Sequence, residues 1–255
     1  MHHPTAIIHP RAQIGADCQI GPYCIIGENV TLGDGCLLHS HVVIDGHTRL
    51  GRENEIFPFA SIGLKTQDLK WKGGLTRTEI GDHNTFRESV TIHSATGDGE
   101  VTTVGSHNHI LACCHVAHNV TVGNHVIMSN YAGLAGHTTV GDHAVLGGMA
   151  AIHQFCRIGK YSMVGGCSRV VQDVAPFMIV EGNPAETRVI NKVGLERNGV
   201  TEEAQSALKQ AYKILFRAGL TIPNALARIE AEVPPLPEIL HLLEFVRTSE
   251  RGVTK

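Results

Sequence analysis

A six-residue repeat runs through most of this 255-residue chain. In the stretch IGADCQIGPYCIIGENVTLGDGCL, which begins at Ile14, an aliphatic residue returns at every sixth position and glycine often follows it. A period of six is neither the period of a helix, about 3.6, nor the period of about two of a plain strand. It is typical of short strands joined by tight corners, where glycine tolerates a positive φ.

The repeat rests on 24 apolar anchors in one phase, of which only Phe86 is aromatic. In hexapeptide proteins three repeats make one triangular coil of about 18 residues, so the anchors predict about eight coils in a prism roughly 40 Å long. The sequence therefore predicts an all-β fold, a parallel β-helix. The anchors are Ile14, Ile20, Ile26, Leu32, Leu38, Ile44, Leu50, Ile56, Ile62, Ile80, Phe86, Ile92, Val104, Ile110, Val116, Val122, Met128, Leu134, Val140, Leu146, Ile152, Ile158, Val164 and Val170.

Two interruptions of the repeat preserve its phase. The in-phase positions are Asp68 and Gly74 in the first and Asp98 in the second. An aspartate directed into an aliphatic prism is costly, so we expect loops that leave the prism at about 64–79 and 94–102. Loops on a rigid scaffold often carry function.

The repeat ends after Val170, and helical signals follow. Thr201 can cap a helix that has two glutamates in its first turn, and Pro223 can start a second helix. The stretch PEILHLLEFVRTSERG has an apolar face at helical spacing and predicts a third. We therefore expect two domains, a β-helix over residues 1–190 and a small α-helical domain over residues 191–255.

A basic stripe is predicted on the first of these helices. Lys209, Lys213 and Arg217 are spaced at every fourth position, so they share one exposed face. A solvated helix face explains such a stripe, and so does a docking surface for an acidic protein partner. The helix pattern alone leaves both interpretations open.

The composition narrows the class of protein. A net charge of −3 argues against a nucleic-acid-binding protein. No apolar run approaches the roughly 20 residues of a membrane span, and the N-terminus lacks the pattern of a secretory signal, so we expect a cytoplasmic protein with reduced cysteines. Five of the seven cysteines share the fourth slot after an anchor, where we expect small buried fillers. They are Cys18, Cys24, Cys36, Cys114 and Cys156.

Histidines gather at one edge of the predicted prism. Residues one coil apart lie above one another, so His118 lies next to Gly136. Imidazole titrates near neutral pH, and a glycine leaves room for a substrate atom beside the backbone. This edge is therefore the candidate site. Its other polar residues are His115, His137, His153 and Gln154.

A second column of histidines competes with the first. His107, His125 and His143 are also spaced by one coil each. Each occupies the third slot after its anchor, a turn position that suits Asp and Asn equally, and no carboxylate is identified that would orient the rings. We predict a turn motif here and no metal site.

Several motifs make the chain resemble one family over essentially its whole length. They are HVAHN, LAGHTTVGD, GGMAAIHQFCRIG, VGGCS, QDLKW and EGNPAETR. With the repeat and the terminal helices, they closely resemble the UDP-N-acetylglucosamine O-acyltransferases of lipid A biosynthesis. The resemblance implies a left-handed coil and a homotrimer with active sites between neighbouring prisms. It also implies transfer of an (R)-3-hydroxyacyl group from acyl carrier protein to the 3-hydroxyl of UDP-N-acetylglucosamine, with no cofactor beyond the carrier's phosphopantetheine arm.

The resemblance also implies roles for single residues. His118 matches the catalytic base, and the Gly136 N–H matches the oxyanion donor, which is often worth roughly 3 to 4 kcal/mol. Gly166 matches the position that sets acyl length, where glycine leaves the channel open for a long chain. The remaining matches, to positions that contact the sugar, its phosphate or the nucleotide or line the cleft, are Asp68, Lys70, His115, His137, His153, Gln154, Asn191 and Arg197.

Two positions depart from the family pattern. Asn119 follows the base where members often have aspartate, and an amide can orient the ring but cannot stabilise imidazolium as a carboxylate does. We expect either a weaker base or a contribution from another carboxylate. Val193 stands in place of an acidic residue two positions after Asn191, so recognition of the nucleotide sugar is expected to differ.

Other functions stay open. The acceptor could be an amine of a nucleotide sugar, and the donor could be coenzyme A, although the basic stripe favours an acidic carrier. From other classes, hexapeptide prisms also serve as metal-dependent carbonic anhydrases, and a silent trimeric scaffold that only binds nucleotide sugars is a third option.

Overall fold

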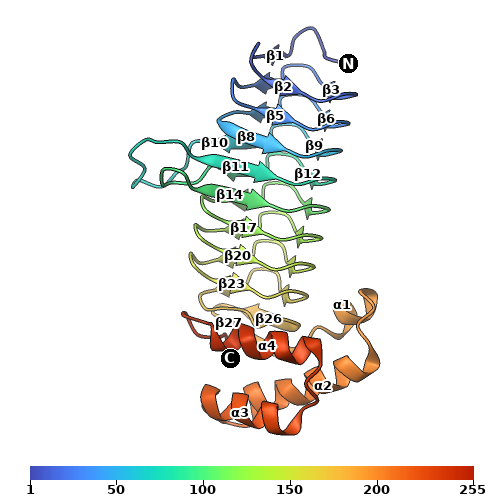
Figure 1. The fold of residues 1–255 in the computed structure, drawn as a ribbon, viewed down its shortest axis with the longest axis vertical. Coiled ribbons are helices and arrows are strands. Elements are labelled where there is room, and N and C mark those ends of the chain that lie inside the picture. The colour runs from blue at the N-terminus through green and yellow to red at the C-terminus, as the bar shows by residue number, and fades with distance from the viewer.

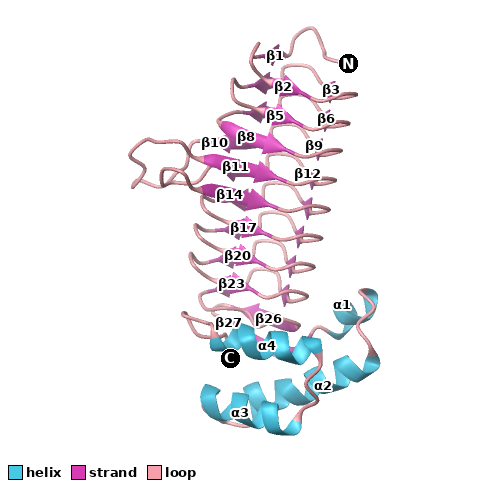
Figure 2. Ribbon diagram, in the orientation of Figure 1, coloured by secondary structure: helices cyan, strands magenta, loops and turns pink.

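The structure is a computed structural model that describes all 255 residues. Its main body is a column of stacked coils, and a group of helices covers one end of the column (Figure 1). Figure 2 shows that the column consists of short strands separated by turns. Successive strands along the chain belong to three different sheets, which are the three faces of the column.

All pairings between coils are parallel, and up to β25 each sheet takes every third strand. The nine-stranded sheet holds β1 (Ile7–Ile8), β4 (Ile25–Ile26), β7 (Val43–Ile44), β10 (Ser61–Leu64), β13 (Thr91–His93), β16 (His115–Val116), β19 (Gly133–Leu134), β22 (Ala151–Ile152) and β25 (Arg169–Val170). The eight-stranded sheet holds β2 (Gln13–Ile14), β5 (Thr31–Leu32), β8 (His47–Leu50), β11 (Arg77–Ile80), β14 (Val101–Val104), β17 (Thr121–Val122), β20 (Thr139–Val140) and β23 (Arg157–Ile158). The ten-stranded sheet holds β3 (Gln19–Ile20), β6 (Leu37–Leu38), β9 (Glu55–Ile56), β12 (Thr85–Phe86), β15 (His109–Ile110), β18 (Ile127–Met128), β21 (Val145–Leu146), β24 (Met163–Val164), β26 (Met178–Gly182) and β27 (Ala185–Ile190), the last two forming an antiparallel hairpin.

The coils keep the predicted register of three repeats, as in the pairing of His115 with Gly133. Two loops increase the sequence separation between paired residues. Ser61 pairs with Thr91 across the first loop, and Thr91 pairs with His115 across the second. The paired residues are then five and four repeats apart instead of three, so each loop adds whole repeats and the phase of the anchors survives. The loops occupy the segments between β10 and β11 and between β13 and β14, where the sequence predicted them.

Aliphatic side chains fill the column. All the anchors are buried except Ile14, which is half-buried near the N-terminal end. The five cysteines predicted as fillers are buried as well. Burial raises the pKa of the Cys36, Cys114 and Cys156 thiols to about 11, so these groups stay protonated and inert at neutral pH.

The repeat glycines serve a different purpose from the one expected. Positive φ values fall on the third residue after an anchor, such as His107 at 60°, and among the glycines that directly follow an anchor only Gly63 has one. These glycines are needed because adjacent coils pack closely. A Cβ on Gly33 would lie 2.6 Å from the Gly51 backbone, and a Cβ on Gly159 would lie 2.4 Å from the Pro176 nitrogen.

The C-terminal part has its own apolar core. Its helices are α1 (Lys192–Arg197), α2 (Glu202–Tyr212), α3 (Ile222–Glu232) and α4 (Pro237–Arg247), with a π-helical turn over Lys213–Arg217. Thr201 caps α2, as predicted, by accepting a hydrogen bond from the Ala204 N–H. The sequence predicted neither α1 nor the β26–β27 hairpin, and this second core already includes Ala175 of the last coil. None of the helices combines the length and apolarity needed to cross a membrane.

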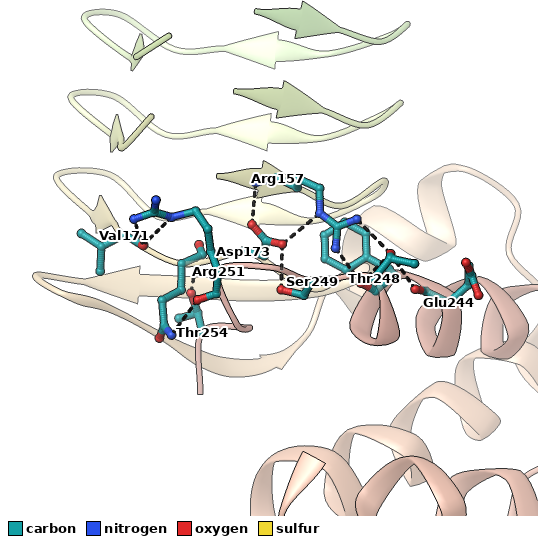
Figure 3. A network of polar contacts seen from close by, with 10 residues as sticks. Arg157, Val171, Asp173, Glu244, Thr248, Ser249, Arg251 and Thr254 are labelled. Carbon is teal, nitrogen blue, oxygen red and sulfur yellow. Dashed lines mark hydrogen bonds and ion pairs between the residues drawn. The ribbon is translucent and has the colours of Figure 1, made fainter. Parts of the chain in front are cut away.

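A polar network joins the last coils to the C-terminal segment (Figure 3). The buried Asp173 carboxylate accepts hydrogen bonds from the backbone N–H and Nε of Arg157 and from Ser249 Oγ, at 2.8 to 2.9 Å. Arg157 Nη2 donates to the Phe245 carbonyl at 2.6 Å, and Nη1 donates to Thr248 Oγ1 at 3.0 Å. The network fixes α4 and the chain after it against the column.

We expect Asp173→Ala to lower the free energy of unfolding by about 3 kcal/mol, because the Arg157 guanidinium loses its buried partner. Urea unfolding followed by circular dichroism measures the loss. Glu186→Ala is the matched control, since Glu186 pairs with Arg188 on the exposed surface and should cost less than about 1 kcal/mol. Equal losses in the two variants would contradict a special role for this network.

Candidate active site

One edge of the column gathers the candidate residues. The chain passes there from the nine-stranded to the eight-stranded sheet, and both loops leave the column on that side (Figure 1). The turn between β16 and β17 carries His118 and Asn119, and the next coil carries Gly136 and His137 at the same edge. The first loop brings Asp68 over these turns, with its Oδ2 3.7 Å from His118 Nε2.

The contacts of Asn119 determine which nitrogen of His118 carries hydrogen. Asn119 Oδ1 accepts a hydrogen bond from the Thr96 backbone N–H at 3.1 Å, and Asn119 Nδ2 donates to Glu100 Oε2 at 2.7 Å. A backbone N–H only donates and a carboxylate only accepts, so these partners fix the orientation of the amide. His118 Nδ1, 2.9 Å from Asn119 Oδ1, must then be the donor. In the neutral ring, Nε2 therefore keeps a free lone pair.

His118 faces a cleft of about 750 Å³ beside the first loop, with Asp68, Lys70, His115 and Gln154 in its polar lining. Gly136 lies so close that a Cβ there would come within 2.4 Å of His118 Cε1 and Nε2. The Gly136 N–H donates to no carbonyl or side chain of the protein. It is therefore available to an oxygen atom of a bound molecule.

Hydrogen bonds and burial set the charges in this region. The pKa of Asp68 is lowered, first by the hydrogen bond that it accepts from the Lys70 N–H at 3.0 Å and then by its proximity to His118. Burial lowers the pKa of His115 and lowers the pKa of His93 to about 4, and the neighbouring histidines add to both effects. At neutral pH Asp68 is therefore ionised, and His115 and His93 are uncharged.

The sequence did not single out Glu100, Thr96 or His93. Glu100 and Thr96 belong to the second loop, which the broken repeat predicted without indicating which side chains return to the column. The absence of a carboxylate after His118 was the one signal that pointed toward a residue such as Glu100. His93 follows an anchor directly and lies buried against His115, with ring centroids 5.2 Å apart.

His137 and His153 lie beside the cleft rather than in its lining. The His137 ring meets the His118 ring edge-on, with centroids 5.2 Å apart, and stacks on Phe155. It lines an adjacent pocket of about 530 Å³ that extends toward the C-terminal segment. His153 is exposed, and its Nδ1 lies 3.2 Å from the Gln154 carbonyl oxygen.

The residues expected to contact the nucleotide and the acyl chain do not line this cleft within one chain. Asn191 is buried and caps α1 by accepting a hydrogen bond from the Gly194 N–H. Arg197 is exposed on the same helix. Gly166 lies at a corner of a later coil, where a Cβ would lie 3.3 Å from the Gly148 carbonyl oxygen.

The basic stripe on the helices is exposed along its whole predicted length, at Lys209, Lys213 and Arg217. Arg217 also makes hydrogen bonds within the chain. It donates from Nε to Tyr212 Oη at 2.7 Å and from Nη2 to the Arg188 carbonyl at 3.0 Å. The π-helical turn changes the spacing of the face, and Arg217 holds the helix against β27. Lys209 and Lys213 are therefore the two cations of this stripe that are free to meet a partner.

The second histidine column is a stack of rings. His83, His107, His125 and His143 lie with successive centroids 4.7 to 4.9 Å apart and interplanar angles of 4 to 11°. Their φ values of 56 to 60° place them at the turn position that the sequence predicted. Nitrogens of parallel rings do not converge on one centre, and no group of three or more His, Cys, Asp or Glu side chains is arranged to hold a metal ion.

Comparison with known proteins decides the family. A profile of the second domain of UDP-N-acetylglucosamine O-acyltransferases matches residues 173–254, and a profile of bacterial transferase hexapeptide repeats matches residues 2–34 and 11–46. LpxA from Acinetobacter baumannii is 47% identical, with 99% of each chain covered and a TM-score of 0.96. The chain belongs to the UDP-N-acetylglucosamine O-acyltransferase family.

Two further solved members agree. The UDP-N-acetylglucosamine acyltransferase LpxA from Bacteroides fragilis is 40% identical with a TM-score of 0.98, and the Arabidopsis UDP-N-acetylglucosamine acyltransferase is 34% identical with a TM-score of 0.89, each with 100% of both chains covered. Family membership confirms the expected fold class, a left-handed parallel β-helix with a small C-terminal helical domain, and the expected enzyme class, an acyltransferase.

We expect His93 to make the folded protein less stable as the pH falls from about 6.5 to about 4. In this range the unfolded state binds a proton at His93 and the folded state does not, so the loss reaches about 2 to 3 kcal/mol by about pH 4.5. Urea unfolding at neutral and acidic pH measures it. The difference in the free energy of unfolding between the two pH values should shrink in His93→Gln. It should not shrink in His3→Gln, which replaces an exposed histidine. An unchanged difference in His93→Gln would contradict the assignment.

Proposed function

We propose that the protein transfers an (R)-3-hydroxyacyl group from acyl carrier protein to the 3-hydroxyl of UDP-N-acetylglucosamine, the first step of lipid A biosynthesis. Family membership supports the class of reaction and the acceptor. One observation carries the catalytic assignment. The amide of Asn119, held by Thr96 and Glu100, makes His118 the tautomer with hydrogen on Nδ1 and a lone pair on Nε2.

His118 is the general base of this reaction. Its Nε2 takes the proton of the sugar hydroxyl while the hydroxyl oxygen attacks the thioester carbonyl. The carbonyl oxygen becomes an oxyanion and accepts a hydrogen bond from the free Gly136 N–H. The tetrahedral intermediate then expels the thiolate of the phosphopantetheine arm. The thiolate takes the proton from Nε2, which leaves an ester, a thiol and the original imidazole.

The polar lining of the cleft suits a nucleotide sugar. The ionised Asp68 accepts hydrogen bonds from sugar hydroxyls, and Lys70 on the same loop complements a phosphate. His115 and Gln154 supply further hydrogen-bonding groups beside the sugar. Arg197 is free to contact the nucleotide, whereas the Asn191 side chain is already engaged in capping α1.

We propose a homotrimer with the acyl chain bound between neighbouring columns. The apolar side chains of Tyr131 and Met149 are 60% and 61% exposed on successive corners of a second edge, which suits contact with another subunit. Such a contact would turn the open cleft into an enclosed one and bring His137 and His153 into its wall. Gly166, which carries no side chain, leaves the channel open for a long acyl chain.

We expect His118→Ala to lower kcat by about a thousandfold, with KM for the nucleotide sugar changed less than about threefold. Mass spectrometry of acyl transfer from (R)-3-hydroxyacyl carrier protein measures this, and His3→Ala near the N-terminus is the control. A 3-amino acceptor and a coenzyme A thioester are assayed in parallel. Comparable turnover in His118→Ala would end the general-base assignment, and faster transfer to the amine would favour an N-acyltransferase.

The double variant Lys209→Glu, Lys213→Glu should raise KM for the carrier-bound donor about tenfold at low salt, because the carrier is acidic. Its KM for UDP-N-acetylglucosamine should stay unchanged. Arg228→Glu is the control, since Arg228 lies exposed on α3 and pairs with Glu232. If the double variant keeps the normal KM for the donor, the carrier docks elsewhere.

A further inference from the structure

The carboxylate of Glu100 is linked to the His118 ring through the side-chain amide of Asn119. Glu100 Oε2 accepts a hydrogen bond from Asn119 Nδ2 at 2.7 Å, and Asn119 Oδ1 accepts one from His118 Nδ1 at 2.9 Å. Carboxylate, amide and imidazole therefore form one hydrogen-bonded chain. It ends at the Nε2 atom that faces the cleft.

We propose that Glu100 is a positioning residue for His118 and acts through Asn119. The inference rests on the proposed function, in which His118 removes the proton of the acceptor. Asn119 alone neither stabilises a protonated His118 ring nor fixes its own orientation. An amide carries no charge, and it presents a donor at one end and an acceptor at the other.

The first contribution of Glu100 is to the orientation of the amide. If the Asn119 amide turned over, its NH₂ group would face His118 Nδ1, and the ring would have to place its hydrogen on Nε2. That tautomer has no lone pair toward the cleft and cannot act as a base there. Glu100 disfavours the turned state because its oxygen would then face the amide oxygen.

The second contribution is electrostatic. When Nε2 takes a proton, the ring becomes a cation, and a carboxylate two hydrogen bonds away stabilises it. The pKa of Glu100 is lowered by the hydrogen bond from Asn119 and by another from the Gly97 N–H at 2.7 Å, so the group is ionised at neutral pH. Glu100 is exposed, and solvent therefore weakens this contribution relative to that of orientation.

The geometry of the second loop holds Glu100 in place. The Gly97 N–H binds the same Oε2 atom that accepts from Asn119. On the other side, the Asn119 N–H donates to Thr102 Oγ1 at 2.8 Å, and its backbone has a φ of 59°. Both ends of the Glu100–Asn119 contact are thus anchored by further hydrogen bonds.

The test compares acyl transfer by substituted full-length proteins. We expect Glu100→Ala to lower kcat about tenfold and to change KM for UDP-N-acetylglucosamine less than about twofold. Glu100→Gln, which still presents an acceptor oxygen to Asn119, should retain kcat to within about threefold. Glu79→Ala removes an exposed carboxylate from the nearby strand β11 and should leave both constants unchanged.

Rescue separates positioning from a general effect on the loop. Asn119→Asp places a carboxylate directly beside His118 Nδ1, so in that background Glu100→Ala should no longer lower kcat. An equal loss in both backgrounds, or a normal kcat in Glu100→Ala alone, would overturn the inference. If Glu100→Ala does not fold, Glu100→Met, which keeps the length of the side chain and cannot accept the hydrogen bond, takes its place.

These outcomes are distinct from failure of the proposed function. That function fails if the unsubstituted protein transfers no acyl group or if His118→Ala remains active. Where transfer occurs and depends on His118 while Glu100→Ala is unaffected, only the role of Glu100 is refuted.

Discussion

The parallel pairing of residues three repeats apart is the constraint on which the rest of the structure depends. It repeats the same backbone path in each coil, so each residue type is copied into a column: anchors inside, glycines where coils pack closely, and residues with positive φ at the corners. The energy comes from burying one aliphatic side chain per repeat. Specificity of register comes from the glycines, because a side chain there would collide with the backbone of the next coil.

The candidate site combines this rigid scaffold with segments that do not obey it. The coils place His118 and Gly136 on adjacent turns, and the column fixes their separation. The loops then bring Asp68 and Glu100 over the same edge from outside. Under the proposed function, the scaffold places the base and the oxyanion donor, and the loops supply charges for binding the substrate and for orienting the base.

The features that the sequence predicted belong mainly to the regular column, and most of those that it missed belong to irregular segments. The period predicted the column, the buried anchors, the cysteine fillers, the loop positions and the proximity of His118 to Gly136, because all of these depend on counting residues. The reason for the repeat glycines was misjudged, since φ is set by corner geometry that a residue pattern does not reveal. Glu100 and the altered role of Arg217 were missed because a loop path and a π-helical turn have no period.

The first loop lengthens its coil by two repeats and the second by one, and both leave the stack above and below them undisturbed. A chain built this way cannot gain or lose a single residue at a strand without turning the following anchors outward. Divergence in length is therefore restricted to whole repeats or to excursions that return to the same corner. New binding sites can therefore evolve in such a protein through longer loops at one edge of the column, while the buried anchors inside it keep their pattern.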